Sequence, residues 1–400
     1  MSSIVLGVSG GIAAYKAALL LRLFTEAGHD VTVVPTESAL EFVGAPTWEA
    51  LSGKPVHTGV FENVPSVNHV RLGQNADLVV IAPATANTLA KATAGLADDL
   101  LTNTLLTAKC PVVLAPAMHT EMWENPATVA NVETLRSRGL FVIEPAVGRL
   151  TGADTGAGRL PEPEAIFGYC LNVLEGRGRD LEGKRFVITA GGTREFLDPV
   201  RFLGNRSSGL QGYALASAAV ARGAYVTLVA ANVALGDPVE VSVVPVVTTA
   251  EMRAETLAAA KDADVGIMAA APADFRPVQV SGAKIKKSED GSAPSIELTQ
   301  NPDILHELVT SRTDSKQVIV GFAAETGDAT TSVLEYAKSK FARKGCDVLV
   351  VNDVGDEKVF GRTENEVTIL TTDGDPVDIP RVTKSGVAHA ILDQIVQRVK

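Results

Sequence analysis

The chain has few cysteines, an excess of acid over base and no long apolar run. Its three cysteines, Cys110, Cys170 and Cys346, lie too far apart to predict a disulfide framework or a metal knuckle. The 36 basic residues against 47 acidic ones leave a net charge of −11, which argues against non-specific nucleic-acid binding. No apolar run reaches the ~20 residues of a membrane span, and no basic segment precedes the first strand-like run. We therefore expect a cytoplasmic protein without a signal peptide.

Two nucleotide-binding signatures are also missing. The chain has no G-x-x-x-x-G-K-[ST], which disfavours a Walker ATPase, and no G-x-G-x-x-G, which disfavours a nicotinamide oxidoreductase. The six histidines show no H-x-x-x-H or similar spacing, so we predict no histidine metal site. A flavodoxin-like electron carrier is an alternative of another class. It would form a stable semiquinone, and it would leave the second half of the chain unexplained.

Short aliphatic runs alternate with alanine-rich stretches such as Ala13–Ala27 and Gly212–Arg222, on both sides of a polar segment at Leu174–Gly183. The runs are continuous, as in parallel strands covered on both faces. The sequence predicts an α/β protein of two doubly wound, mostly parallel, Rossmann-like domains, 1–180 and 181–400. The expected strands are Ile4–Val8, Val31–Val34, Leu78–Ala82, Val112–Ala115, Phe141–Ile143, Phe186–Ala190, Val226–Ala231, Val265–Ala269, Val318–Gly321 and Val348–Val351, with an edge hairpin of Glu366–Leu370 and Val377–Ile379.

Small polar loops follow the first three expected strands. They read Ser9-Gly10-Gly11-Ile12, Pro35-Thr36-Glu37-Ser38 and Ala82-Pro83-Ala84-Thr85-Ala86-Asn87. Ligands of open α/β sheets bind at the carboxyl ends of the strands, where hydroxyl and backbone N–H groups suit a phosphate and a planar ring. A lone strand–Gly-Gly–helix is also explained by a tight turn. The three loops together favour a phosphate-bearing cofactor.

The second half opens on FVITAGGTREFLDPVRFLGNRSSGLQG, at Phe186–Gly212. A strand, a glycine turn and a helix in this order form an anion site, because N–H groups at the helix start point at the ligand. The loop between them, Asp198–Gly209, carries two guanidinium groups, an amide and two hydroxyls within twelve residues. A basic run follows at Lys284-Ile285-Lys286-Lys287, which by itself is more often a solvated face than a site.

These motifs resemble two known enzyme families. SGGIAAYK at Ser9–Lys16, APATANTLAKATAGLADDLL at Ala82–Leu101 and PAMHTEMW at Pro116–Trp123 resemble the flavin-dependent phosphopantothenoylcysteine decarboxylases. The Phe186–Gly212 stretch resembles the phosphopantothenate–cysteine ligases. The resemblance covers nearly all 400 residues and implies a flavodoxin-like flavoprotein domain followed by a ligase domain. Such a bifunctional enzyme of coenzyme A biosynthesis joins cysteine to 4′-phosphopantothenate and decarboxylates phosphopantothenoylcysteine to 4′-phosphopantetheine.

For the first half, the resemblance implies FMN and a catalytic histidine. The family's histidine matches His69 in Asn68-His69-Val70-Arg71-Leu72, although a lone histidine is more often structural. In the family, flavin takes a hydride from the cysteine side chain, CO2 leaves from the resulting thioaldehyde, and the flavin returns the hydride. The implied FMN contacts are Ser9, Gly10, Gly11, Ile12, Thr36, Ser38, Pro83, Ala84, Thr85 and Asn87.

Two positions depart from the family pattern. His119 stands where the family's PxMNxxMW motif has an asparagine that grips the substrate carboxylate; a histidine can still donate a hydrogen bond there. Gly152, in TGADTGAGR at Thr151–Arg159, stands where the family has a cysteine that donates a proton. The donor therefore stays open among His119, Asp154, Thr155 and a bound water. Brønsted behaviour favours His119, since an acid whose pKa lies near the operating pH donates best.

No thiol of the first half is expected to replace that cysteine. Cys110 precedes Pro111 at the edge of an expected strand, and Cys170 lies in an apolar helical stretch, Ile166–Leu174. Both are predicted to be small core residues, and buried thiols are poor nucleophiles and poor acids.

For the second half, the resemblance implies a CTP-dependent ligase. In the family, CTP converts the carboxylate to an acyl cytidylate, and the cysteine amine displaces CMP. Lys284 matches the family's KIKK and would hold triphosphate charge, while Arg201 and Asn205 would act on the acyl cytidylate. Mg²⁺ would arrive with the triphosphate, and its protein ligands stay open. The other implied CTP contacts are Ala270, Asp274, Asn301, Pro302, Asp303, Ile304, Phe322, Lys340 and Lys344, with Asp274 accepting from the cytosine amine.

The resemblance also implies a homo-oligomer. In the family, the decarboxylase unit forms trimers in which the histidine at the position of His69 reaches a neighbour's flavin, and the ligase unit forms dimers. Three-fold and two-fold contacts together would close a dodecamer.

Overall fold

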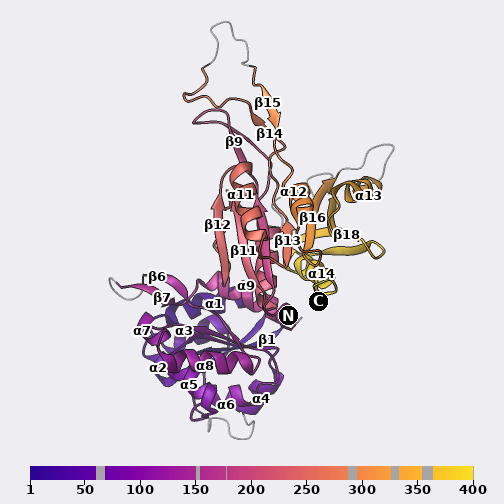
Figure 1. Cartoon of the computed structure of the whole chain (residues 1–400). Coiled ribbons are helices and arrows are strands. Elements are labelled where there is room, and N and C mark those ends of the chain that lie inside the picture. The colour runs from indigo at the N-terminus through magenta and orange to yellow at the C-terminus, as the bar shows by residue number, and fades with distance from the viewer. Residues whose placement is uncertain are drawn as a thin grey trace. The chain divides into compact units, whose positions relative to one another are not determined.

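The computed structural model describes residues 1–59, 68–149, 154–176, 178–286, 295–325, 333–353 and 364–399. The chain divides into two compact units, Met1–Gly176 and Arg177–Lys400 (Figure 1). Each unit contains its own mostly parallel sheet with helices packed against it. This arrangement confirms the fold class that the continuous aliphatic runs predict.

Within the described residues, the first unit has a five-stranded parallel sheet in the order β2-β1-β3-β4-β5. Every residue of β3 and β4 is buried, which is why their sequences are continuous rather than alternating. The chain passes from β1 to one side for β2 and to the other side for β3, so a topological switch point lies between β1 and β3. The strands are β1 (Ser3–Val8), β2 (Asp30–Pro35), β3 (Leu78–Ala84), β4 (Val112–Pro116) and β5 (Phe141–Val142).

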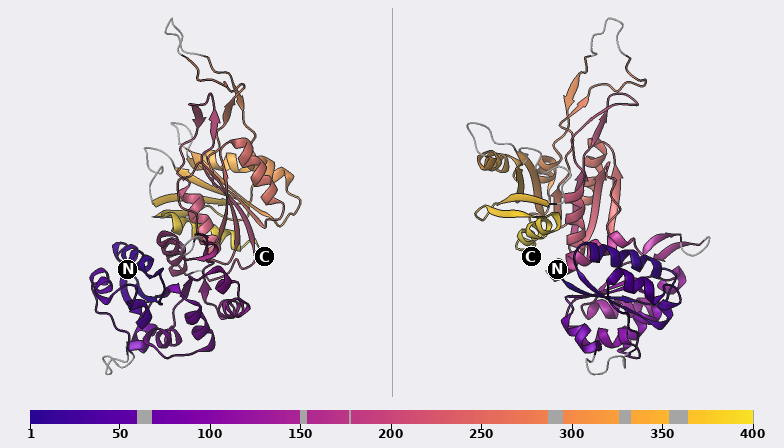
Figure 2. Two further views of the ribbon diagram at one scale, coloured as in Figure 1. Left: turned by 90° about the vertical axis from the view of Figure 1, so that its left-hand side faces the viewer. Right: turned by 180° about the vertical axis from the view of Figure 1, so that it is seen from behind.

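Helices cover both faces of this sheet (Figure 2). Helix α1 shows what holds a helix to the sheet. Its side chains Leu20, Leu21 and Phe24 recur at helical spacing on one face and are at most 1% exposed. Burial of each such side chain stabilises the unit by about 1.5–3 kcal/mol. A separate antiparallel hairpin, β6 (Ala146–Arg149) with β7 (Thr155–Arg159), precedes the last helix. The helices are α1 (Ala14–Glu26), α2 (Glu37–Leu40), α3 (Ala45–Ser52), α4 (Asn68–Asn75), α5 (Ala86–Ala94), α6 (Leu100–Thr107), α7 (Thr120–Trp123), α8 (Pro126–Ser137) and α9 (Pro163–Leu174).

The described part of the second unit contains an eight-stranded sheet in the order β12-β11-β8-β13-β16-β17-β18-β19. The strands from β12 to β17 run parallel, and β18 and β19 form an antiparallel hairpin at the edge, as the sequence predicts. The sequence did not predict β12, a partly exposed edge strand that contains Pro245. The strands are β8 (Arg185–Gly191), β11 (Tyr225–Ala231), β12 (Val241–Val246), β13 (Val265–Met268), β16 (Val318–Glu325), β17 (Val348–Asp353), β18 (Glu364–Thr371) and β19 (Val377–Thr383).

Helix α10 begins two residues before the predicted Gly212. Gly209 precedes it with a left-handed φ of 78°, a conformation that glycine adopts without strain. Gly212 lets the helix approach β8 closely, because an added Cβ there would lie 2.6 Å from the Ala190 Cβ. Among the described residues, no helix is long and apolar enough to cross a membrane. The helices are α10 (Leu210–Ala221), α11 (Thr249–Ala260), α12 (Ile304–Ser311), α13 (Val333–Lys344) and α14 (Lys384–Val396).

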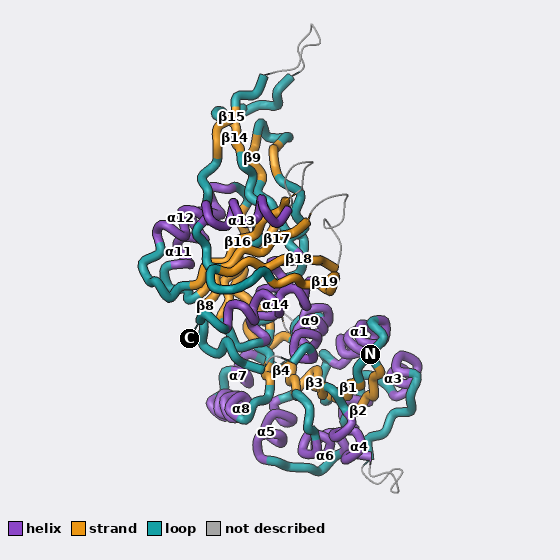
Figure 3. The backbone as a smooth tube through the Cα atoms, turned by 90° about the vertical axis from the view of Figure 1, so that its right-hand side faces the viewer, coloured by secondary structure: helices purple, strands orange, loops and turns teal. Residues whose placement is uncertain are grey.

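Two short antiparallel ribbons leave the second unit beyond the carboxyl ends of its parallel strands (Figure 3). One pairs β9 (Arg194–Phe196) with β10 (Phe202–Gly204), and the other pairs β14 (Phe275–Pro277) with β15 (Leu298–Gln300). The strands β9 and β14 contact each other, so the ribbons lie side by side. The sequence predicted neither ribbon, and yet they carry or flank most of the polar residues predicted to act in the second half.

Candidate functional site

Two cavities lie at the carboxyl ends of the first unit's strands. The larger has a volume of about 510 Å³, and its lining includes the predicted residues Gly10, Gly11, Ile12, Pro83, Thr85 and His119. The smaller, of about 470 Å³, is lined by Ser9, Gly10, Thr36, Ser38, Thr85 and Asn87, among others. Ala84 is the exception among the ten predicted contacts: it is fully buried in β3 and lines neither cavity.

Hydrogen bonds fix the three loops against one another. The Ser9 hydroxyl donates to the Pro83 carbonyl at 2.6 Å and accepts from the Thr85 N–H at 2.9 Å. The Thr36 and Ser38 hydroxyls lie 3.1 Å apart. A Cβ added at Gly10 would lie 2.4 Å from the Ser38 Oγ, so the loop after β1 leaves room only for glycine. The result is a cradle of backbone and hydroxyl groups at a switch point, the setting in which α/β proteins bind phosphate.

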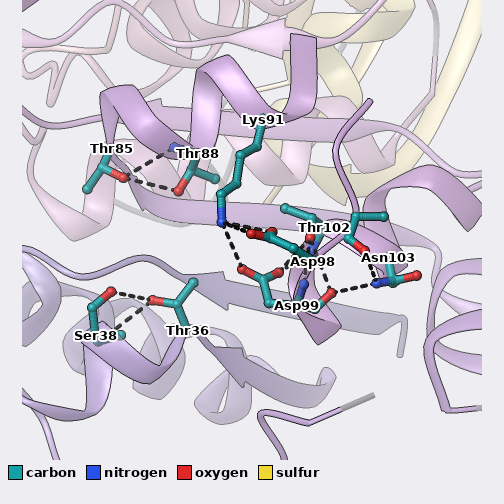
Figure 4. A network of polar contacts seen from close by, with 11 residues as sticks. Thr36, Ser38, Thr85, Thr88, Lys91, Asp98, Asp99, Thr102 and Asn103 are labelled. Carbon is teal, nitrogen blue, oxygen red and sulfur yellow. Dashed lines mark hydrogen bonds and ion pairs between the residues drawn. The ribbon is translucent and has the colours of Figure 1, made fainter. Parts of the chain in front are cut away.

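A charged network closes the far side of the smaller cavity (Figure 4). The Lys91 ammonium lies 2.8 Å from both carboxylate oxygens of Asp98 and 3.8 Å from Asp99. The hydrogen bond between Lys91 and Asp98 lowers the pKa of Asp98 and raises the pKa of Lys91. Asp99 also caps α6, accepting from the Thr102 N–H at 2.8 Å in a capping box. No role for these residues was predicted from the sequence, because a lysine followed seven and eight residues later by two acids is typical of an ordinary solvated face.

His119 and Arg159 meet at the larger cavity. His119 precedes α7 with an exposed side chain that makes no capping bond, and the Met118 N–H donates to the Gly158 carbonyl at 2.9 Å. This bond holds the loop after β4 against β7, so that His119 and Arg159 both line the cavity. Gly152 lies outside the described residues. Asp154 is exposed and lines neither cavity.

His69 lines neither cavity of the first unit. It lies on α4, which packs closely on α6 because Gly73 faces Thr107; an added Cβ would meet the Thr107 Oγ1 at 2.3 Å. The Thr107 hydroxyl donates to the His69 carbonyl at 2.8 Å. The His69 Nδ1 is buried and has no hydrogen-bond partner within the described residues. The fold therefore fixes the helix of His69 by these contacts, and among the described residues the ring is part of neither of these two cavities.

In the second unit, Asp198 joins the two ribbons. Its buried carboxylate accepts from the N–H groups of Val200 at 2.7 Å, Arg201 at 2.8 Å and Ile285 at 3.1 Å. The Arg201 guanidinium lies 3.1 Å from the same carboxylate and 3.1 Å from the Ile285 carbonyl. Burial alone would raise the pKa of Asp198, but these donors outweigh it and hold the pKa below its usual value. Arg201 and the segment of Lys284 are thus brought together.

Lys284 itself is exposed beside this anchor, and Lys287 lies outside the described residues. The Asn205 amide donates to the Pro272 carbonyl at 2.8 Å, which connects the first ribbon to the loop after β13. Asp274 is exposed at the end of that loop. The predicted Arg201, Asn205, Lys284 and Asp274 therefore occupy one end of the second unit.

A buried polar cluster supports this end. Asn301 donates to the Ala273 carbonyl at 2.9 Å and accepts from the Arg276 guanidinium at 2.8 Å. Glu195, only 5% exposed, accepts from both the N–H and the hydroxyl of Thr249, at 2.9 and 2.8 Å. No role for Glu195, Thr249 and Arg276 was predicted from the sequence; Glu195 is the buried residue of β9, between the exposed Arg194 and Phe196.

The remaining predicted nucleotide contacts differ in how far they are buried and in whether they form polar contacts. Asp303 caps α12 and pairs with Lys344; burial alone would raise the pKa of Asp303, but the bonds from Lys344 and the His306 N–H hold it below its usual value. Ile304 is 3% exposed and packs in the hydrophobic core, so its side chain is not available as a surface contact. Ala270, Phe322 and Lys340 are partly buried and Pro302 is exposed. In the part of the chain that the structure describes, no group of three or more His, Cys, Asp or Glu side chains could hold a metal ion.

Comparison with known proteins gives one consistent result. The family described as Flavoprotein matches residues 1–175, and the DNA/pantothenate metabolism flavoprotein C-terminal domain matches residues 181–399. The chain is 57% identical to the coenzyme A biosynthesis bifunctional protein CoaBC of Mycobacterium tuberculosis over 401 residues, 98% of this chain and 96% of the relative. It is 44% identical to the CoaBC of Bacillus subtilis over 398 residues, with 98% and 96% covered.

A solved structure is also similar. The C-terminal domain of a CoaBC is 40% identical, covers 55% of this chain and 97% of that chain, and has a TM-score of 0.46. The two full-length relatives agree with both family matches and confirm the resemblance that the motifs predict. The chain therefore belongs to the CoaBC family, the bifunctional enzymes of coenzyme A biosynthesis that join a flavoprotein half to a DNA/pantothenate metabolism half.

Proposed function

We propose that residues 1–180 bind FMN and decarboxylate phosphopantothenoylcysteine, and that residues 181–400 first make this compound from 4′-phosphopantothenate, cysteine and CTP. The proposal rests on the family membership and on the position of the predicted residues around two adjoining cavities at a switch point. The proposed substrates and products are small metabolites, and the acidic chain suits no nucleic acid partner.

The loops of the first unit fit FMN. Backbone and hydroxyl groups of Ser9, Gly10, Thr36 and Ser38 form a cradle for a phosphate, and a Cβ at Gly10 would fill it. The lining of the larger cavity includes Pro83, Met118 and Met122. Its volume is sufficient for part of a planar ring and a thiol substrate. Bound FMN would supply reversible hydride transfer, which the side chains alone do not provide.

In this proposal His119 and Arg159 bind the substrate carboxylate, and His119 supplies the proton that the family takes from a cysteine. Both residues line the larger cavity, and a histidine can act as donor near neutral pH. His69 orients or deprotonates the substrate thiol, but it lines neither of the two described cavities that would hold the flavin and the substrate. We therefore propose that His69 serves the site of a neighbouring subunit, which requires the trimer, and the dodecamer, that the family resemblance implies.

For ligation, we propose that Lys284 holds triphosphate charge and that Asp274 accepts from the cytosine amine. Arg201 and Asn205 would then polarise the acyl cytidylate while the cysteine amine attacks its carbonyl carbon and CMP leaves. Asn301, Asp303, Lys340 and Lys344 would complete the nucleotide contacts, and Mg²⁺ would bind through the triphosphate rather than through a protein cluster. The anchoring of Arg201 and the Lys284 segment on Asp198 is the observation that favours this assignment.

A coupled assay tests the whole proposal. The purified protein is given 4′-phosphopantothenate, cysteine and CTP, and pyrophosphate, phosphopantothenoylcysteine and CO2 are followed together. We expect pyrophosphate to depend on CTP and Mg²⁺, and CO2 to depend on the flavin that colours the protein. A colourless protein that takes up no FMN would refute the first half, and preference for ATP over CTP would refute the cytidine assignment of Asp274.

A further inference from the structure

Three charged side chains meet at the base of the β6–β7 hairpin. The Lys16 ammonium donates to the Glu162 Oε1 at 3.1 Å and to the Leu160 carbonyl at 3.3 Å. The Arg159 guanidinium donates to the same carboxylate oxygen of Glu162. Lys16 and Arg159 line the larger cavity, whereas Glu162 lies behind them and does not. One carboxylate thus holds two cations of the cavity wall.

Lys16 gives this cluster its rigidity. Its side chain is only 9% exposed, and a nearly buried ammonium requires a counter-charge and hydrogen-bond acceptors. It comes from the first turns of α1, whose apolar face packs into the core, so its position is set by the helix. Glu162 is therefore fixed from the Lys16 side, although 55% of its own side chain is exposed.

Arg159 pairs with Glu162, its one carboxylate partner among the described residues. Its guanidinium offers five N–H donors, and its side chain is 42% exposed where it lines the cavity. A planar guanidinium whose orientation is already fixed loses less conformational freedom when it binds a carboxylate. The Met118 N–H to Gly158 carbonyl bond keeps Arg159 beside His119, which occupies the position of the family's carboxylate-binding asparagine.

We propose that Glu162 is a positioning residue that, held by Lys16, aims the Arg159 guanidinium at the carboxylate of the decarboxylase substrate. This inference rests on the proposed decarboxylase function. Glu162 touches no reacting atom; it acts through Arg159. Because the substrate carboxylate is bound before the reaction and is lost as CO2, the interaction belongs to ground-state binding and is expected to change KM more than kcat.

The test compares Glu162→Gln with a matched control, Glu164→Gln, in the full-length protein. Both acids lie at the start of α9, but Glu164 is exposed and lines neither of the two described cavities. Decarboxylation of phosphopantothenoylcysteine is followed by CO2 release, and the product 4′-phosphopantetheine, which lacks the carboxylate, is measured as a competitive inhibitor. We expect Glu162→Gln to raise KM about 10-fold with kcat within about two-fold, to leave product inhibition unchanged, and Glu164→Gln to match the wild type.

A double variant distinguishes an effect on the orientation of the Arg159 guanidinium from a general effect on folding. Arg159→Lys keeps the charge but loses the planar fork, so it should raise KM by itself. Adding Glu162→Gln to Arg159→Lys should then change KM little further, because the group that Glu162 aims is already altered. Fully additive effects, equal weakening of substrate and product, or an unchanged KM in Glu162→Gln would each overturn the inference. A wild type that binds FMN but releases no CO2 would instead refute the proposed decarboxylase function.

Discussion

Gly10 offers a sharp test of the flavin site, and Gly168, in the same unit, provides the control. A Cβ at Gly10 would lie 2.4 Å from the Oγ, 2.6 Å from the Cβ and 2.8 Å from the carbonyl carbon of Ser38. A Cβ at Gly168 would meet nothing within 4 Å outside the backbone of its own helix, and Gly168 lines neither of the two cavities described above. Neither glycine has a positive φ, so alanine changes the steric contact at each position and not the backbone conformation.

The expected effect of Gly10→Ala follows from these distances. The loops after β1 and β2 must separate by about 1 Å to restore normal contact, which for an overpacked site costs about 1–3 kcal/mol. If that cost falls on the flavin-bound state, the Kd for FMN rises about 5- to 150-fold, at 1.4 kcal/mol for each factor of ten. Gly168→Ala should stay near the wild-type Kd.

The Kd of each variant for FMN is measured by titrating FMN into flavin-stripped protein and following the quenching of FMN fluorescence. CTP-dependent pyrophosphate release by the same samples checks that the second unit is intact, since it contains neither glycine. Equal Kd values for Gly10→Ala and Gly168→Ala would refute the reasoning, because the cradle between the two loops would then not hold the cofactor. If a variant lost both FMN binding and CTP-dependent pyrophosphate release, the loss would indicate general unfolding.

Three further variants address the chemistry. Lys284→Gln should slow ligation about 100-fold and leave flavin absorbance and decarboxylation unchanged; equal loss of both activities would contradict a local role at the triphosphate. Asn205→Asp should let the acyl cytidylate form but slow its capture by cysteine, as mass spectrometry of trapped intermediate would report; abolished pyrophosphate release would move Asn205 to the first step. Burial raises the pKa of both Cys110 and Cys170, so their thiols stay protonated at neutral pH, and alkylating agents should inhibit little. The Cys110→Ala, Cys170→Ala double variant should keep most of its decarboxylase activity, while His119→Ala should lose about 100-fold or more, and the reverse pattern would assign the proton to a thiol.

The main strands could be predicted from the sequence because each is buried on both faces. Runs such as Leu78–Ala82 and Val348–Val351 contain no polar residue to blur the pattern. The two ribbons could not be predicted in this way, since β9, β10, β14 and β15 are three residues long and largely exposed. Strand β12 was missed because Pro245 reads as a break, although an edge strand tolerates proline.

The loops of the first unit could be predicted because topology alone places them. Parallel strands bring their carboxyl ends to one edge, so residues as distant as Ser9 and Thr85 had to meet. The Lys16–Glu162 pair could not be predicted, since its members are 146 residues apart. A weaker signal was present: Lys16 falls on the apolar face of α1, between Ala13 and Ala17, where a charge needs a partner.

Asp198 is an acid that lies among residues proposed to bind an anion, and its hydrogen bonds explain how it can do so. Its carboxylate is buried against three backbone N–H groups and one guanidinium, so its charge is largely neutralised where it lies. What it contributes is geometry, because the bond to the Ile285 N–H, 87 residues away, fixes the backbone beside Lys284. Lys284 keeps its own side chain exposed, so its charge is accessible to a triphosphate. Asp198 therefore positions this cation while its own carboxylate stays buried and hydrogen-bonded.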